Sequence, residues 1–344
     1  MPFTHRTSPH LDAARRHGVE WAADMGFLDP PGVWDRRRYL GYDLAHCAAM
    51  IHADATPEQL DLSTDWLAWG TFGDDWFPVA FGATRNLAAA KAADDRFALF
   101  MPLDDEPVPP PATALERGLA DLWRRTAGPM PPAARATFRR AVQDMTSSWL
   151  WELANQAEHR VPDPVDYVEM RRRTFGSDMT MSLARLAHTD LLPPDLFANR
   201  VLHELDTAAQ DWACFLNDLF SYQKEVQFEG EIHNVVVVVE TFLGADRYTA
   251  RDIVARLMDE RMAQFQRLSA EGIPAMVAEL GLDDDVAALV RRHAADLEDW
   301  MSGILEWHRT CVRYAEADLY AERRVAWLPP AGPVPRPPVL VAGG

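Results

Sequence analysis

The chain has 344 residues, a length that allows one large domain or two of ordinary size. Apolar residues make up 48% and charged residues 25%, with 12 Trp, 15 Phe and 13 Met, so a large core can form and disorder of the whole chain is excluded. The formal net charge of -18 would repel nucleic acid and anionic membrane surfaces, so we expect neither as a partner.

Cysteine usage and the amino terminus indicate a cytoplasmic protein. Cys47, Cys214 and Cys311 are odd in number and far apart, which fits a reducing compartment and gives no zinc spacing. The first 16 residues are polar and lack the apolar region of a signal peptide. The longest uncharged apolar run, 235–239, is far shorter than the roughly 20 residues that a membrane span needs.

Most of the chain has apolar residues at three- and four-residue spacing, the period of a helix. The clearest helical segments are 114–126, 133–159, 208–229, 250–271 and 286–320. Proline-rich loops divide them at 102–111, 128–132, 162–164 and 193–194. We predict an all-α fold with a single domain at 1–326 and a proline-rich, disordered tail at 327–344.

One segment is ambiguous, because Val235 to Val239 are five β-branched residues in a row and local propensity favours a strand. Asn234 before the run is a good helix cap. We therefore predict a buried helix here.

The stretch from Asn217 to Glu225 is the most informative for function. Asn217, Ser221 and Glu225 are spaced i, i+4 and i+8, so on a helix their three oxygen-bearing side chains share one face. Such oxygens are the ligands that Mg²⁺ prefers. The alternative is a solvated polar stripe on an amphipathic helix. Lys224 adjoins this face and could meet an anion.

Asp74 and Asp75 form a second acidic cluster. They are surrounded by large aromatics, so their burial would be costly unless a cation or a proton compensates. Pro78 predicts a helix end or kink nearby, and two solvated aspartates at such an end are the alternative. Phe72 and Trp76 belong to an aromatic stripe that could line a pocket or simply pack in a core.

These two motifs, in a helical chain of this length, resemble the metal-binding motifs of the class I terpene synthases. Five segments are further similar to the carboxy-terminal half of bacterial germacradienol/geosmin synthases. They are 71–78, 99–104, 116–123, 149–155 and 217–234. The resemblance runs from about Ser8 to about Leu319. It implies a helical bundle around a central apolar pocket.

The resemblance also implies roles for individual residues. Arg171, 46 residues before Asn217, falls where such enzymes place the arginine that senses the diphosphate. The Arg313-Tyr314 pair matches the pair that binds the departing diphosphate, a task suited to the planar guanidinium. The implied Mg²⁺ ligands are Asp74, Asp75, Asn217, Ser221 and Glu225.

The aspartate motif departs from the family pattern, because Pro78 and Val79 stand where a further acidic ligand is usual. A truncated metal site fits the reaction implied for the geosmin half-enzyme. That reaction is proton-initiated retro-Prins fragmentation of germacradienol to geosmin with loss of acetone, with Mg²⁺ partly or wholly dispensable. The implied partner is a tandem amino-terminal germacradienol synthase domain.

The carbocation path needs a proton donor and an aromatic wall. Adjacent carboxyl groups in an apolar mouth cannot both ionise cheaply, so Asp74 and Asp75 are the predicted donors, with His308 as the rival. The candidate wall is Trp69, Phe72, Trp76, Phe77, Tyr222 and Trp307.

Two alternative functions stay open from the sequence. One is a standalone Mg²⁺-dependent sesquiterpene cyclase that ionises farnesyl diphosphate. The other is a catalytically silent domain that binds a terpenoid or a partner protein.

Overall fold

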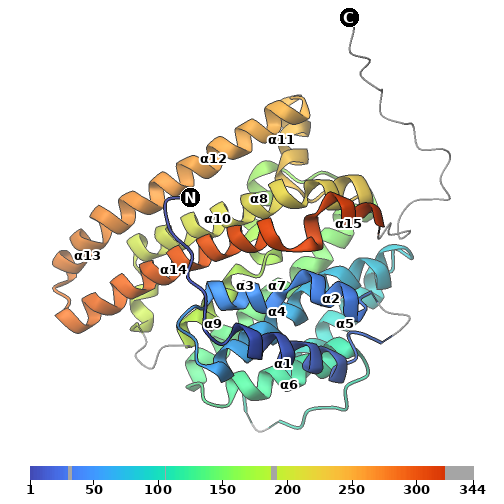
Figure 1. The fold of residues 1–344 in the computed structure, drawn as a ribbon, viewed down its shortest axis with the longest axis horizontal. Helices are drawn as coiled ribbons and strands as arrows, with labels where there is room; N and C mark the ends of the chain where they lie inside the picture. The colour runs from blue at the N-terminus through green and yellow to red at the C-terminus, as the bar shows by residue number, and fades with distance from the viewer. Residues whose placement is uncertain (30–32, 105, 187–191, 322–344) are drawn as a thin grey trace, which may run out of the picture.

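Our computed structural model describes residues 1–29, 33–104, 106–186 and 192–321 (Figure 1). Over this part of the chain the backbone forms helices and no strand, which confirms the predicted all-α class. None of the described helices is long and apolar enough to cross a membrane. The predicted tail at 327–344 lies outside the described residues, and the prediction of a single domain stays a prediction.

Seven of the described helices surround the centre of the molecule: α3 (Leu44–Ile51), α4 (Pro57–Phe77), α7 (Pro132–Glu158), α8 (Pro164–Thr174), α9 (Ser177–Leu186), α10 (Arg200–Tyr222) and α14 (Asp284–Thr310). The outer helices are α1 (Leu11–Asp24), α2 (Arg36–Tyr42), α5 (Leu87–Phe97), α6 (Ala114–Ala127), α11 (Val235–Leu243), α12 (Arg247–Arg267), α13 (Ile273–Leu280) and α15 (Glu316–Ala321). Short π- and 3₁₀-helical segments are η1 (Pro78–Gly82), η2 (Ala98–Phe100), η3 (Pro194–Ala198), η4 (Gln223–Glu229), η5 (Leu268–Gly272) and η6 (Val312–Tyr314).

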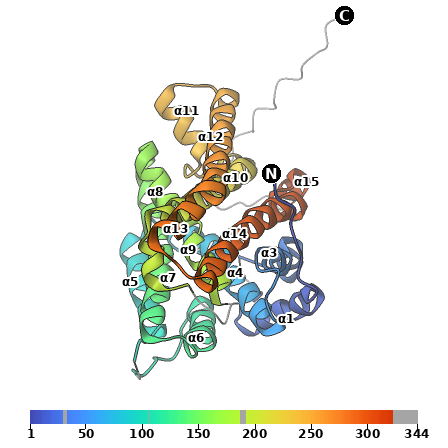
Figure 2. The same ribbon diagram turned by 90° about the vertical axis from the view of Figure 1, so that its left-hand side faces the viewer.

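The long helices α10, α12 and α14 run side by side along one face of the bundle (Figure 1). Viewed from the side, α7 and α8 lie on one flank of α14, and α1 and α3 lie on the other (Figure 2). The helices between these flanks enclose the centre, where apolar side chains from segments distant in sequence are buried together.

Helix α4 illustrates how local sequence fixes an element. Thr56 and Gln59 form a reciprocal capping box, with Thr56 N donating to Gln59 Oε1 over 2.9 Å and Gln59 N donating to Thr56 Oγ1 over 3.3 Å. Pro57 occupies the first turn, where its missing N–H costs nothing. At the other end the α-helix stops at Phe77 and a π-helical segment begins at Pro78, which confirms the predicted break.

The valine run forms helix α11, as predicted. Asn234 caps it, since its Oδ1 accepts a hydrogen bond from Val236 N over 3.0 Å. Four of the five valines are buried, so tertiary burial outweighs the weak helix propensity of β-branched side chains.

Two segments that the periodicity predicts to be continuous helices change their helical geometry or end early in the structure. The helix predicted at 208–229 begins earlier, at Arg200, and its α-helical part ends at Tyr222, after which η4 continues in a π-helix. The helix predicted at 286–320 ends at Thr310, so Arg313 and Tyr314 lie in the 3₁₀ turn η6 and not on the last long helix. Both breaks flank the functional site.

Candidate active site

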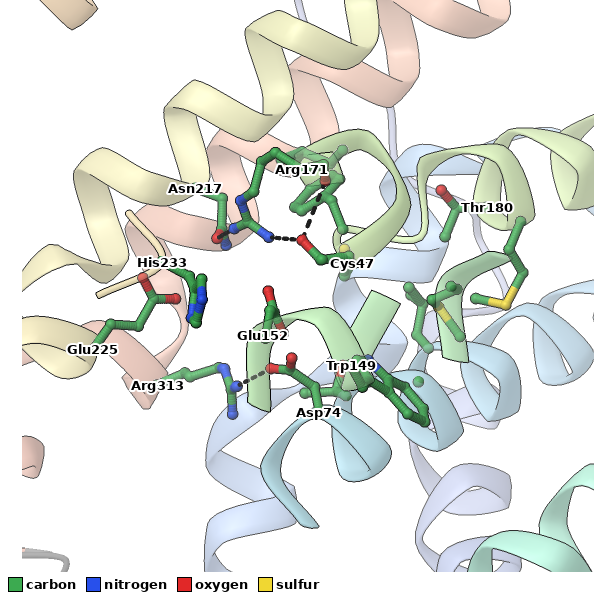
Figure 3. A pocket seen from close by; sticks show the side chains of 18 of the residues that line it. Cys47, Asp74, Trp149, Glu152, Arg171, Thr180, Asn217, Glu225, His233 and Arg313 are labelled. Carbon is green, nitrogen blue, oxygen red and sulfur yellow. Dashed lines mark hydrogen bonds and ion pairs between the residues drawn. The ribbon is translucent and has the colours of Figure 1, made fainter. Parts of the chain in front are cut away.

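A cavity opens at the centre of the helical bundle. Figure 3 shows charged and amide side chains gathered toward one end of it, including Asp74, Glu152 and Arg171, and Trp149 and Thr180 toward the other. The cavity therefore has a polar end and an apolar end.

The polar end is built on one side by the carboxyl end of α10 and by η4. Asn217 and Glu225 line the cavity, and Ser221 lies between them in sequence. Glu225 follows the change from α-helix to π-helix, a local widening of the turn that often occurs at functional sites. Glu225 is further fixed by Asn234 Nδ2, which donates to its Oε2 over 3.2 Å.

Asn217 is held in a buried network with the α8 arginine. Arg171 Nη2 donates to Asn217 Oδ1 over 2.5 Å, and Arg171 Nε donates to Asp218 Oδ1 over 2.8 Å. The other oxygen of Asp218 accepts from Tyr167 Oη over 2.6 Å and from Val235 N over 2.8 Å. The predicted diphosphate-sensing arginine is therefore in direct contact with the predicted metal-binding asparagine.

The two aspartates at the end of α4 occupy different environments. Asp75 is buried, and Arg313 donates to both of its oxygens, over 2.9 and 3.0 Å, while Trp34 Nε1 donates over 2.8 Å. Asp74 lines the cavity, with its Oδ2 3.6 Å from Arg313 Nη2. The prediction treated the two as equivalent, but Asp75 is committed to the ion pair and Asp74 is the one that faces the cavity.

Lys224 supplies the third buried cation of this region, after Arg171 and Arg313. Its Nζ lies 2.6 Å from Glu229 Oε2 and 3.9 Å from Asp75 Oδ1. Burial by itself lowers the pKa of Lys224, but Glu229 raises it above its ordinary value, so the ammonium stays charged. Three side chains thus bring positive charge around the polar end.

Acidic groups are crowded at the same end. Burial, with Asp74 nearby, raises the pKa of Glu152 to about 8, and burial raises the pKa of Glu225 to about 7. Burial and Asp75 raise the pKa of Asp74, and burial and Glu229 raise that of Glu231. Carboxyl groups that resist ionisation together mark a place where a cation is stabilising.

Glu152 and Glu231 were not among the predicted site residues. Glu152 lies on α7, in the segment 149–155 that carries part of the family resemblance, and Glu231 follows η4. The available signal was a single acidic residue within the aromatic sequence of α7. Periodicity could not show that this residue faces Asp74 and Glu225 across the cavity.

The apolar end is lined by aromatic and sulfur-bearing side chains. Phe77 and Trp307 belong to the predicted wall, and both line the cavity. The lining also includes aromatic and sulfur-bearing residues that the prediction missed: Cys47, Trp66, Met145, Trp149, Phe175, Met179 and Trp300.

Phe72 and Trp76 lie elsewhere, and their placement on the wall is corrected. Phe72 stacks on Phe27 with ring centroids 4.3 Å apart, inside the core. Trp76 packs on Phe81 at 5.4 Å. The stripe that includes Trp69, Phe72 and Trp76 is on a different face of α4 from the cavity residues Trp66, Gly70, Asp74 and Phe77. Tyr222, also predicted, is not among the lining residues.

Trp149 crosses closely over α4 just before the aspartates. A Cβ atom on Gly73 would lie 2.3 Å from Trp149 Cη2, so only glycine allows this approach. The indole therefore forms a wall beside Asp74, at the junction of the polar and apolar ends.

The structure separates the candidate proton donors. Asp75 is held by Arg313 and Trp34 and does not line the cavity, so it is badly placed to protonate a substrate. His308 is buried, which lowers its pKa to about 4, and its Nδ1 lies 2.8 Å from the Ile304 carbonyl oxygen, to which it donates. It is therefore neutral near pH 7 and has no free N–H, which argues against its predicted role as an acid. The role of Asp74 as proton donor stays a prediction, and its raised pKa is compatible with that role.

The polar end fits a small hard cation. Asn217, Ser221 and Glu225 supply an amide oxygen, a hydroxyl and a carboxylate, and Asp74 supplies a further carboxylate across the cavity. Ser221 Oγ is buried with no hydrogen-bond partner among the described residues, so an electropositive ligand would satisfy it. All of these atoms are oxygens, the donor type that Mg²⁺ prefers.

Comparisons with known proteins agree with this geometry. Residues 65–264 match the family model described as terpene synthase family 2, C-terminal metal binding. Pentalenene synthase of Streptomyces avermitilis is 31% identical, over 92% of this chain and 92% of that protein. The (+)-T-muurolol synthase ((2E,6E)-farnesyl diphosphate cyclizing) of Roseiflexus castenholzii is 28% identical, over 91% of this chain and 92% of that protein.

Solved structures give the same result. Wild-type cucumene synthase superposes with a TM-score of 0.75 at 27% identity, over 90% of this chain and 99% of that one. None of these similarities supports the predicted conversion of germacradienol to geosmin, or the tandem partner domain. The matched segment contains both acidic motifs and Arg171, and the chain belongs to terpene synthase family 2.

Proposed function

We propose that the protein is a Mg²⁺-dependent sesquiterpene cyclase that ionises farnesyl diphosphate and cyclises the resulting cation. The observation that carries the proposal is a set of three buried cations: Arg171 and Arg313 line the polar end, and Lys224 Nζ lies 3.9 Å from Asp75 Oδ1. An alcohol substrate such as germacradienol has no need of three cations, whereas a diphosphate does. The names of the sesquiterpene synthase relatives favour the same substrate class.

The chain's own residues would divide the work at the polar end. Asp74, Asn217, Ser221 and Glu225 would hold Mg²⁺, which when bound neutralises charge on the departing diphosphate. Arg171 and Arg313 would bind diphosphate oxygens through paired, charge-assisted hydrogen bonds. In the described structure both guanidinium groups bind carboxylates, Asp218 and Asp75, which keep them in place beside the cavity.

The apolar end would hold the hydrocarbon chain. Trp149, Phe175 and Trp300 present aromatic side chains, whose π-faces stabilise a carbocation. The surrounding methionines and leucines exclude water until the final step. An aromatic, largely apolar wall is expected for an enzyme whose intermediates react at once with water.

The test is a product assay with two substrates. The chain is incubated with farnesyl diphosphate and with germacradienol, each with and without Mg²⁺, and the volatiles are identified by gas chromatography and mass spectrometry. We expect cyclic fifteen-carbon products from the diphosphate only, and only with Mg²⁺. Geosmin from germacradienol, without products from the diphosphate, would overturn the proposal. Failure to convert either substrate would favour the silent binding domain.

A matched pair of variants ties the activity to this site. Glu225→Gln removes a proposed metal ligand, and Glu279→Gln makes the same chemical change on the exposed surface of α13. The first should abolish Mg²⁺-dependent product formation and the second should leave it unchanged. Equal activity of the two variants would show that the reaction occurs elsewhere.

A further inference from the structure

His308 lies against the metal-binding asparagine, although it belongs to no motif recognised in the sequence. It is on α14, 91 residues from Asn217, and is 3% exposed. Its Nε2 lies 2.9 Å from Asn217 Nδ2, and its Nδ1 lies 2.8 Å from Ile304 O, one turn back on the same helix. Both ring nitrogens are therefore in hydrogen bonds.

The chemistry of these partners fixes the hydrogens. A carbonyl oxygen only accepts, so Nδ1 of His308 carries the proton and donates to Ile304. In the neutral ring Nε2 is then an acceptor, and the amide nitrogen of Asn217 is the donor. His308 thus offers a lone pair to Asn217, which only the NH₂ end of the amide can use.

The opposite end of the same amide meets a group that can only donate. Arg171 Nη2 lies 2.5 Å from Asn217 Oδ1, and a guanidinium has no acceptor. Tyr314 Oη accepts a further hydrogen bond from Asn217 Nδ2 over 3.1 Å. Reversing the amide would place oxygen against a lone pair and NH₂ against NH₂, so its orientation is determined by His308 and Arg171, whereas the Tyr314 hydroxyl can donate or accept.

The imidazole itself is held rigidly. It stacks on Tyr314 with centroids 5.0 Å apart and an interplanar angle of 5°. The Trp307 and Phe220 rings lie 4.9 and 5.4 Å away. The ring cannot turn without losing these contacts. His308, on α14, therefore keeps a fixed position relative to the Asn217 side chain on α10.

We propose that His308 is a positioning residue that orients the Asn217 amide, so that its oxygen and not its nitrogen is presented on the side of Arg171 and the cation site. The proposal rests on the proposed function, since Asn217 is a metal ligand there. An amide that presented NH₂ to a cation would repel it. His308 lines the cavity, and it acts on the cation site through its hydrogen bond with Asn217.

Two substitutions of His308 separate orientation from packing. His308→Phe keeps a ring between Tyr314 and Trp307 but removes the acceptor. His308→Gln places its Oε1 near the former Nε2 and keeps an acceptor. Binding of Mg²⁺ with inorganic pyrophosphate is measured by calorimetry and by the shift in Tm, so that the result does not depend on turnover.

We expect His308→Phe to weaken Mg²⁺ binding by about 10–100-fold, the usual effect of losing a residue that orients a metal ligand, and His308→Gln to restore most of it. The control is His293→Gln, a buried histidine of the same helix that binds Asp206 and does not line the cavity. It should leave Mg²⁺ affinity unchanged. Folded His308→Phe protein with wild-type Mg²⁺ affinity would overturn the proposal.

A second background makes the test specific to orientation. In Asn217→Asp the two oxygens of the carboxylate are equivalent, so no partner is needed to choose between them. Adding His308→Phe should then cause no further loss of Mg²⁺ affinity. A further loss as large as in the wild-type background would show that His308 acts by another route.

The proposed function can fail separately. If the chain makes no product from farnesyl diphosphate but His308→Phe still weakens binding of Mg²⁺ and pyrophosphate, only the proposed function is wrong. If products form and this variant binds Mg²⁺ normally, only the role of His308 is wrong.

Discussion

The two acidic walls of the cavity, the end of α4 and the α10–η4 segment, differ in how many of their oxygens are free for a ligand. On α4, Asp75 is already bound by Arg313 and Trp34, and Asp74 alone faces the cavity. On the α10 side, Ser221 has no partner among the described residues, and Glu225 lines the cavity. We therefore expect the α10 wall to provide most of the protein ligands of a metal ion, whereas the α4 wall mainly holds Arg313.

Pro78 and Val79, which follow the α4 wall, lie in a segment with a different helical geometry. The position after Phe77 is a π-helical segment, whose changed turn alters the direction of the following side chains. A carboxylate is instead brought to the cavity by α7, at Glu152. Counting acids along α4 alone underestimated the negative charge around the site.

The largest expected effect comes from a substitution in the α4 wall. Asp75→Asn removes the carboxylate that neutralises Arg313, and leaving one member of a buried ion pair unpaired costs about 3–5 kcal/mol. We expect that loss in the free energy of unfolding, measured with urea. Asp74→Asn should change stability far less, because Asp74 borders the cavity, and should instead weaken Mg²⁺ binding. Equal destabilisation by the two variants would contradict the division of roles.

The next effect tests the α10 wall. Asn217→Ala removes a proposed ligand and the acceptor for Arg171, and we expect kcat/KM to fall by about 10²–10³-fold, the range for losing one preorganised electrostatic contact. The assay is product formation from farnesyl diphosphate at saturating Mg²⁺. A reduction smaller than that of Asp74→Asn would reverse the proposed ranking of the walls.

A smaller effect compares the aromatics inside and outside the cavity. Trp149→Phe should change the product ratio severalfold, because the indole borders the space where the cation forms. Phe72→Leu should lower stability by about 1–2 kcal/mol and leave the product ratio unchanged, since Phe72 packs on Phe27. Product ratios come from gas chromatography. An altered ratio in the Phe72 variant would place that residue at the site after all.

The smallest effect is a pH dependence. The pKa of Glu152 is about 8 in the fold against an ordinary value near 4.5, so the folded state favours the protonated form. The contribution of Glu152 to the free energy of unfolding is therefore fully present below about pH 4.5 and is lost as the pH rises through about 8. Glu152→Gln should therefore be closest to the wild type in stability below pH 4.5 and should become progressively more stable than the wild type as the pH rises to 8, in the absence of Mg²⁺. Identical pH profiles would contradict the raised pKa.

Much of the fold and half of the site followed from local patterns. Periodicity and proline-rich loops located the principal helices, and Asn234 marked the start of α11 despite its valines. The spacing of Asn217, Ser221 and Glu225 identified the α10 wall, because helical geometry alone brings residues four apart onto one face. The break at Pro78 followed equally from local sterics.

The rest depended on contacts between distant segments. The pairing of Asp75 with Arg313 joins residues 238 apart, and that of Asn217 with His308 joins residues 91 apart. Aromatic residues occur on more than one face of α4, so composition could not show which face borders the cavity. The predicted wall combined Phe72 and Trp76 with Phe77, and of these only Phe77, on the face with Trp66 and Asp74, lines the cavity.

The sequence by itself determined the helical class and the terpene synthase family, and it predicted the oxygen ligands on α10, because these depend on spacing within single segments. Only the tertiary structure decided which aspartate faces the cavity, that Glu152 lines it as well, and that His308 contacts Asn217. The physical reason is that periodicity sets angles around one helix axis, whereas ion pairs, pKa values and cavity walls depend on which helices pack together.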